Sequence, residues 1–138
     1  MSNYISHIAT VEIPVSKLDR SVNFYVDVLG VEVEFKGEKN AMLSFQSKGV
    51  PTIFLVETAA EGKSLSFANS NDGVEHSVID FYTPSLRELH QWLQEKNVEV
   101  GPLNLNQEHG LGGFGFKDPD GNLLSACICC IKGNKPAH

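Results

Sequence analysis

Cysteine is scarce in this chain of 138 residues, and its three cysteines are crowded at positions 127, 129 and 130. An odd number of adjacent thiols does not make the disulfide framework on which small secreted domains depend. The sequence also lacks an apolar run of 18 residues and a basic N-terminal segment followed by an apolar one. We therefore expect neither a membrane span nor a secretory signal, and predict a cytoplasmic protein.

Basic residues are few as well: 11 Lys and Arg stand against 17 Asp and Glu, for a net charge of −6. Both signs are scattered, with no basic stripe of the kind that binds nucleic acid or anionic membranes, so neither is an expected partner. The hydrophobic content of 41% is ordinary for a globular protein. A chain of this length buries roughly two-thirds of its unfolded surface, enough to fold without a structural metal.

The first half of the chain begins with alternating apolar and polar side chains at 8–15, which predict a strand with one buried face. Ser16 is a candidate N-cap for an amphipathic helix at 18–29, which Gly30 ends. Three further short strands follow, at 31–37, 41–46 and 52–58.

The second half repeats this order. A strand at 75–82 precedes Thr83 and Pro84, which predict the N-cap and first residue of a second helix. Asn97 can end that helix in the left-handed conformation. The last three strands are predicted at 98–106, 113–118 and 123–131, and a turn with positive φ at both Asp120 and Gly121 precedes the final one.

Two βαβββ modules in one α+β domain at 1–131 are the economical interpretation. Module one spans about 5–58 and module two about 74–131. The Ser/Asn/Gly-rich segment 59–73 is interpreted as a linker, and 132–138 as a mobile tail.

Two motifs carry a resemblance to a known family. The first is S-x-x-F-Y-x-x-x-L-G at 21–30, and the second is D-P-D-G-N at 118–122. With the paired modules, they resemble the vicinal oxygen chelate superfamily, which includes glyoxalases, bleomycin-resistance proteins and extradiol dioxygenases. The resemblance covers about residues 5–131. It implies a homodimer and a cleft lined by the strands at 8–15, 51–57, 75–82 and 123–131.

The resemblance also implies four places for ligands of a divalent metal, which polarises the substrate in enzymatic members. In this chain they hold Thr10, Phe54, His76 and Ser125. One imidazole with two neutral hydroxyls does not hold Zn²⁺, Ni²⁺, Mn²⁺ or Fe²⁺ tightly. We therefore expect no cofactor. His7 and Glu57 are off-pattern metal candidates, because strand alternation places them on the opposite face.

Several other side chains are candidates for the cleft. Glu12 shares the face of Thr10, so Glu12 and His76 are the candidate catalytic acid or base; an ion pair or an ordinary strand histidine are the alternatives. Cys127 shares the face of Ser125 by alternation, as does Cys129, and small thiols are also common core residues. His109 lies in a Gly-rich segment, which is either a ligand contact or a plain loop.

Three functions remain open. The first is a metal-independent protein that binds a small organic molecule. The set of ligand-binding candidates is Thr10, Glu12, Phe54, His76, His109, Ser125 and Cys127. The second is a metal-dependent lyase, isomerase or dioxygenase that uses His7, Glu57 and His76. The third is a dimeric structural or regulatory module with a vestigial cleft. The apolar Phe54 in a ligand position favours the first.

Overall fold

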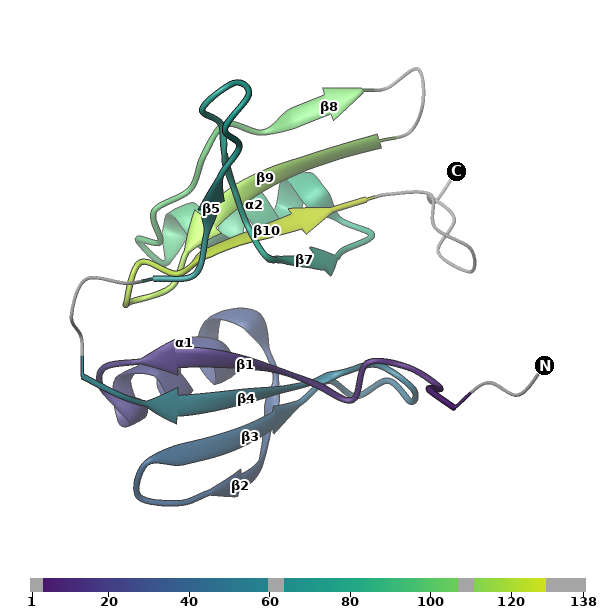
Figure 1. Ribbon diagram of the computed structural model, residues 1–138. Coiled ribbons are helices and arrows are strands. Elements are labelled where there is room, and N and C mark those ends of the chain that lie inside the picture. Colours follow the sequence, from purple (N-terminus) through teal and green to yellow (C-terminus); the bar gives the residue numbers. More distant parts are fainter. Residues whose placement is uncertain (1–3, 60–63, 107–110, 129–138) are drawn as a thin grey trace. The chain divides into compact units, whose positions relative to one another are not determined.

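The computed structural model describes residues 4–59, 64–106 and 111–128 (Figure 1). The chain divides into two compact units, residues 1–63 and 64–138. The predicted tail at 132–138 lies outside the described residues, as do His109 and Cys129. Among the described helices, none is long and apolar enough to cross a membrane.

The first unit has the predicted order of one strand, one helix and three strands (Figure 1). The elements are β1 (Thr10–Val15), α1 (Leu18–Leu29), β2 (Glu32–Lys36), β3 (Asn40–Ser44) and β4 (Thr52–Glu57). The strand order in the sheet is β1-β4-β3-β2, with β1 and β4 parallel and the other pairs antiparallel. The first βαβββ module is therefore confirmed.

Helix α1 covers one face of this sheet, because its apolar stripe meets the inward side chains of the strands. Leu18, Val22 and Tyr25 are buried on the helix. The buried strand residues alternate along the sequence, and they are Ile13, Val15, Ala41, Leu43, Ile53 and Leu55. Gly30 ends the helix with φ 79°, as predicted for a residue that must take the left-handed conformation.

The second unit repeats the arrangement (Figure 1). Its elements are β5 (Phe67–Ala68), β6 (Glu75–His76), β7 (Ile79–Tyr82), α2 (Leu86–Glu95), β8 (Asn104–Asn106), β9 (Leu111–Lys117) and β10 (Leu123–Cys127). The strand order in the larger sheet is β7-β10-β9-β8, with β7 and β10 parallel. Strands β5 and β6 form a separate antiparallel pair. The fold is thus α+β, with two tandem βαβββ modules.

Helix α2 packs its buried Leu86 and Leu93 toward the second sheet. The buried side chains of that sheet are Phe114, Phe116, Leu124 and Ala126. His90 joins them from the helix: its ring meets Phe114 edge-on at 4.7 Å, and Nε2 is 2.9 Å from the carbonyl of Gly101. Asn97 has φ 60°, so its predicted left-handed conformation after the helix is confirmed.

The prediction of one continuous strand over 75–82 was wrong. Glu75 and His76 pair with Ala68 and Phe67 in the β5–β6 ribbon, whereas residues 79–82 pair with β10. The chain changes partner at Ser77 and Val78, because the two parts give their backbone hydrogen bonds to different strands. Strand β5 falls within the segment that was interpreted as a linker, 59–73.

The strand predicted at 98–106 is shorter in the structure, because β8 covers residues 104–106 alone. Val100 forms an isolated bridge with Phe116, and the N–H of Gly101 donates to the carbonyl of Gly115 at 2.8 Å. Pro102 follows directly and has no N–H to donate, which accounts for the interruption of the ladder.

Both predicted N-cap residues were wrong, by one residue for α1 and by two for α2, although α1 begins at Leu18 as predicted. The N-cap of α1 is Lys17, and the hydroxyl of Ser16 accepts a hydrogen bond from Arg20 at 3.2 Å. The N-cap of α2 is Ser85, whose N–H donates to the Thr83 hydroxyl at 3.1 Å. Neither N-cap side chain bonds to its own helix, so the local capping rule failed at both places.

The turn before β10 also differs from its prediction. Gly121 has φ 81°, but Asp120 does not take a positive φ. The N–H of Gly121 donates to the carbonyl of Asp118 at 2.9 Å, and the N–H of Asp118 to the carbonyl of Asn122 at 3.1 Å. The loop therefore has three residues. The Asp118 carboxylate stabilises it by accepting the N–H groups of Asp120 and Asn122, each at 2.9 Å.

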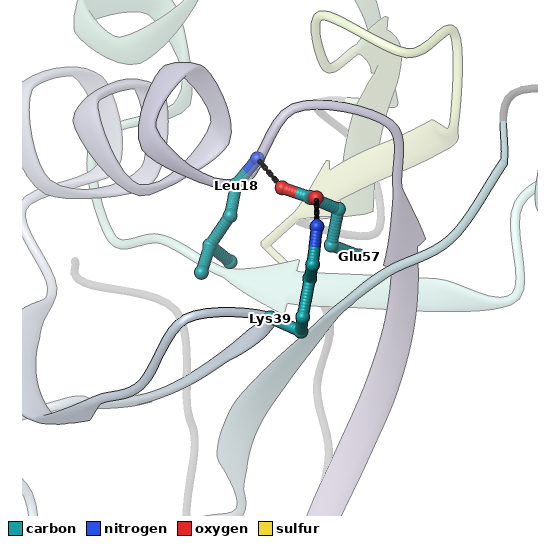
Figure 2. Close-up of polar contacts among 3 residues, drawn as sticks. All are labelled: Leu18, Lys39 and Glu57. Carbon is teal, nitrogen blue, oxygen red and sulfur yellow. Dashed lines mark hydrogen bonds and ion pairs between the residues drawn. The ribbon is translucent and has the colours of Figure 1, made fainter.

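The N-terminus of α1 is capped by a carboxylate from the end of strand β4 (Figure 2). Glu57, at the end of β4, accepts the N–H of Leu18 at 2.9 Å through Oε2 and the ammonium of Lys39 at 2.8 Å through Oε1. A negative charge is favourable at a helix N-terminus, where N–H groups lack partners. The hydrogen bonds from Lys39 and then from Leu18 hold the pKa of Glu57 below its ordinary value of 4.5.

We expect Glu57→Gln to lower the stability of the protein at neutral pH, because the amide brings no charge to the helix terminus or to Lys39. The expected size is a drop of a few degrees in melting temperature. A depressed pKa in the folded state gives stability that is present above the unfolded pKa and lost as pH falls through the folded one. The difference from wild type should therefore disappear as pH falls below 4.5. Thermal melts across this range check it.

Glu38→Gln is the matched control, since it removes a charge of the same sign beside Lys39 from an exposed residue that does not cap the helix. The capping role is contradicted if both variants melt alike at every pH, or if the deficit of Glu57→Gln persists in acid.

Candidate functional site

The face of the first sheet that α1 does not cover, called here the first open face, carries three of the predicted site residues. In the register of the sheet, Glu12 lies opposite Phe54, and Phe54 lies opposite Met42. Residues directly opposite each other share a face, and Thr10 shares it by alternation. The predicted common face of Thr10, Glu12 and Phe54 therefore agrees with the register.

Thr10 and Phe54 offer little to a metal ion on this face. The Thr10 hydroxyl donates to the carbonyl of Thr52 at 3.1 Å and lies 3.8 Å from Sδ of Met42. Phe54 is half-buried and has no donor atom. Glu12 is exposed. The first open face thus carries the apolar Phe54 and Met42, the exposed carboxylate of Glu12 on β1, and a second carboxylate, Glu32 on β2, opposite Ser44.

The two off-pattern candidates of this unit lie elsewhere. Glu57 pairs with Val15, so it does not share the face of Phe54, and its two oxygens bond to Leu18 and Lys39 (Figure 2). His7 precedes β1, so the alternation used to assign its face does not reach it. Its Nδ1 is 2.9 Å from the hydroxyl of Ser6 at an exposed position.

His76, the best predicted ligand, lies in the short strand β6 rather than in the second sheet. Its ring is exposed and stacks on Phe67, with 5.1 Å between the ring centres and 13° between the planes. The β5–β6 pairing places the two rings opposite each other. The imidazole is therefore held on an aromatic surface, with room for a further contact.

Ser125 lies in the middle of β10, on the face of the second sheet away from α2, called here the second open face. Its hydroxyl lies 2.6 Å from that of Ser77 and 3.2 Å from the carbonyl oxygen of Ile79, and it donates to the carboxylate of Asp80. Asp80 is the residue directly opposite in β7. The serine that occupies the predicted place of a metal-binding carboxylate is therefore bonded to a carboxylate on the neighbouring strand.

These residues surround a hollow of about 290 Å³ in the second unit. Its polar lining consists of Glu75, His76, Ser77, Asp80 and Ser125, and Gly115 and Leu123 also line it. We call this space the β10 hollow. It brings together two predicted site residues, His76 and Ser125, with three polar residues that the sequence analysis missed.

Glycines opposite β10 leave room on the second open face. Gly115 lies opposite Ser125 and Gly113 opposite Cys127. A Cβ at Gly115 would meet Leu123 Cδ1 at 3.4 Å and the Leu124 carbonyl oxygen at 3.6 Å, which are ordinary contacts. The absence of a side chain at Gly115 therefore keeps open a space that a larger residue would fill.

Cys127 shares the face of Ser125, as alternation predicts, and it is half-buried opposite Tyr82. It does not line the β10 hollow. Its predicted neighbour in the pattern, Cys129, lies outside the described residues.

Asp80 was accessible to sequence reasoning, whereas Ser77 was not. In the segment 79–82, Ile79 and Phe81 alternate with Asp80 and Tyr82, so period two places Asp80 on an outward face. Ser77 lies at the point where the chain leaves β6 for β7. Its position depends on the pairing of β5 with β6, which no local sequence pattern predicts.

The side chains at the four predicted places do not fit a tightly held divalent metal. Phe54 has no ligand atom, the Thr10 hydroxyl bonds to a backbone carbonyl and the Ser125 hydroxyl to Asp80, so His76 alone remains. Within the part of the chain that the structure describes, no group of three or more His, Cys, Asp or Glu side chains is placed to hold a metal ion.

Comparison with known proteins agrees with this fold. Residues 4–125 match the model of the Glyoxalase/Bleomycin resistance protein/Dioxygenase superfamily. No curated protein sequence matches the chain.

Three similar solved structures share the fold at low identity. The fosfomycin resistance protein FosX from Listeria monocytogenes is 16% identical with a TM-score of 0.69, and the alignment covers 95% of this chain and 97% of that one. Lactoylglutathione lyase from Agrobacterium tumefaciens is 20% identical, with a TM-score of 0.66 and coverage of 91% and 95%. TnmS3, an antibiotic binding protein from Streptomyces sp. CB03234, is 23% identical, with a TM-score of 0.63 and coverage of 99% and 100%. Because the family model spans most of the sequence, the chain belongs to the Glyoxalase/Bleomycin resistance protein/Dioxygenase superfamily.

Proposed function

We propose that this protein binds a small organic molecule in the β10 hollow, without the metal site that enzymatic members of its family use. The observation that carries the proposal is the hydrogen-bonded group of Ser125, Ser77 and Asp80 beside Gly115. Ligand sites combine a concave surface with a few convergent polar groups, in volumes of about 300–1,000 Å³. The hollow, at about 290 Å³, suits a ligand at the small end of that range.

Two further features support binding as the role of this site. His76 lines the hollow, and its ring stacks on the ring of Phe67. TnmS3, which has the same fold, is named as an antibiotic binding protein. A role in binding rather than catalysis therefore has a precedent on this fold, although the fold hosts many functions.

The metal-dependent lyase, isomerase or dioxygenase is the second candidate, and the exposed imidazole of His76 is the observation in its favour. It would need partners for His76 other than Glu57, whose carboxylate is engaged at the terminus of α1. The homodimer and the cytoplasmic location inferred from the sequence stay predictions.

We expect the purified protein to carry substoichiometric metal after incubation with Ni²⁺, Zn²⁺, Mn²⁺ or Fe²⁺, because one imidazole does not hold these ions tightly. Its melting temperature should not change on addition of a chelator, and His76→Ala should behave in the same way. Metal analysis and thermal melts check this. Near-stoichiometric metal that is lost in His76→Ala would overturn the metal-free proposal.

We expect Gly115→Ala to weaken the binding of small organic fragments to the β10 hollow while it leaves the fold intact. The added methyl meets neighbours at 3.4 and 3.6 Å, so the backbone need not move, yet it occupies part of the space beside Ser125. Fragments are selected because they shift the backbone NMR signals of Ser125 and Asp80 in the wild-type protein. Their dissociation constants are then compared between wild type and Gly115→Ala. A loss of about tenfold corresponds to about 1.4 kcal/mol.

Gly101→Ala is the matched control, because its Cβ would also make an ordinary contact, 3.5 Å from the Gly115 carbonyl oxygen, and Gly101 does not line the hollow. The site is misplaced if both variants bind the fragments as wild type does, or if no fragment of a broad library shifts the signals of Ser125 and Asp80.

A further inference from the structure

The hydrogen atoms of the Ser77–Ser125–Asp80 group can be assigned from the chemistry of its oxygens. The Ser125 hydroxyl has one hydrogen, and it lies within reach of two groups that can only accept, the Asp80 carboxylate and the Ile79 carbonyl. The charged acceptor makes the stronger bond. Ser125 therefore donates to Asp80, and Ser77 donates to Ser125 across 2.6 Å.

In this assignment both hydroxyl hydrogens are used within the group, one toward Ser125 and one toward Asp80. What the group presents to the hollow are lone pairs: those of the Ser77 oxygen and the second carboxylate oxygen of Asp80. Glu75 adds another carboxylate to the same lining. The side chains other than His76 thus offer hydrogen-bond acceptors, and a complementary ligand must bring donors.

The negative charge of this lining is not balanced within the described residues. Among the residues that the structure describes, the hollow has no Lys or Arg in its lining. Asp19, Glu57 and Glu99 each form an ion pair with a lysine, whereas among the described residues neither Glu75 nor Asp80 takes part in one. A ligand that brings a positive charge therefore gains a Coulomb attraction that a neutral ligand does not.

Exposed apolar side chains adjoin the lining residues in the chain or in the β5–β6 pair. Phe67 is 55% exposed although it stacks on His76. Val74 precedes Glu75 and Val78 follows Ser77 in the chain, and both are more than half exposed. Aromatic faces attract cations as well as flat apolar groups.

We propose that the β10 hollow selects small organic cations, specifically a protonated amine joined to a compact apolar group. The ammonium donates to Asp80 and to the Ser77 oxygen, and the apolar part lies against the rings of His76 and Phe67. This inference rests on the proposed function, since it names the class of ligand for the same site.

Three probes of similar size and different charge test it: benzylammonium, benzyl alcohol and benzoate. Each is titrated into the ¹⁵N-labelled protein at neutral pH and low salt, and shifts of the Ser77, Asp80, Gly115 and Ser125 signals are followed. We expect benzylammonium to bind about tenfold more tightly than benzyl alcohol, with benzoate the weakest. Because both acids are exposed, this preference should shrink as salt is raised.

Asp80→Asn keeps an oxygen that accepts from Ser125 but removes the charge, so it should bring the affinity for benzylammonium closer to that for benzyl alcohol. Glu75→Gln should also lower the affinity for benzylammonium. Glu88→Gln is the control, because it removes one negative charge from an exposed position on α2, the helix that covers the other face of this sheet. It should leave all three affinities unchanged.

The outcomes separate this inference from the proposed function. If benzyl alcohol or benzoate shifts the same signals with equal or higher affinity than benzylammonium, the choice of cation is wrong while the site stands. If Glu88→Gln weakens benzylammonium as much as Asp80→Asn does, net charge rather than the hollow is responsible, and the inference is again overturned. If no probe of any charge shifts these signals and the broader fragments also fail, the proposed function itself falls.

Discussion

The parallel pairing of the first sheet strand and the last strand in each unit is the constraint on which both open faces depend. In the first unit it sets Glu12 opposite Phe54, and in the second it sets Asp80 opposite Ser125. A slip of one residue would turn every side chain of a strand to the other face. The buried alternating residues, such as Ile13 and Leu124, make such a slip costly. The buried side chains on the helix side of each sheet therefore fix the strand register, and with it the side chains on the open face.

The chemistry of the second open face follows from a carboxylate that lies one strand away from its expected place. The family resemblance puts a metal-binding acid where Ser125 stands, but Asp80 on β7 brings a carboxylate to the hydroxyl of Ser125. A negative charge is thus present one strand away, on a carboxylate that accepts the hydroxyl hydrogen of Ser125. A carboxylate that accepts a hydroxyl hydrogen through one oxygen keeps its other oxygen for a ligand. For the ligand that we propose, this favours hydrogen-bond donors.

Local patterns predicted the elements well, because each depends on side chains near in sequence. The alternation at 8–15 and the left-handed Gly30 and Asn97 are examples. The failures have a shared cause in contacts distant in sequence. The strand predicted at 75–82 breaks because β6 pairs with β5, and α1 is capped by Glu57, 39 residues away from Leu18. The position of Ser77 depends on that break, so pattern reasoning could not reach it, although it could have reached Asp80.

Glu57 and Asp80 show how charge balance separates a structural carboxylate from one that is available to a ligand. Glu57 accepts hydrogen bonds from an ammonium and from a helix N–H, so both of its oxygens have donors (Figure 2). Its negative charge is balanced by Lys39 within the protein. Asp80 meets a neutral hydroxyl, which supplies a hydrogen but no charge. In water such a charge costs little, since the solvent balances it. A ligand that replaces this water must supply the balance itself, and an ammonium group does so with its donors and its charge together.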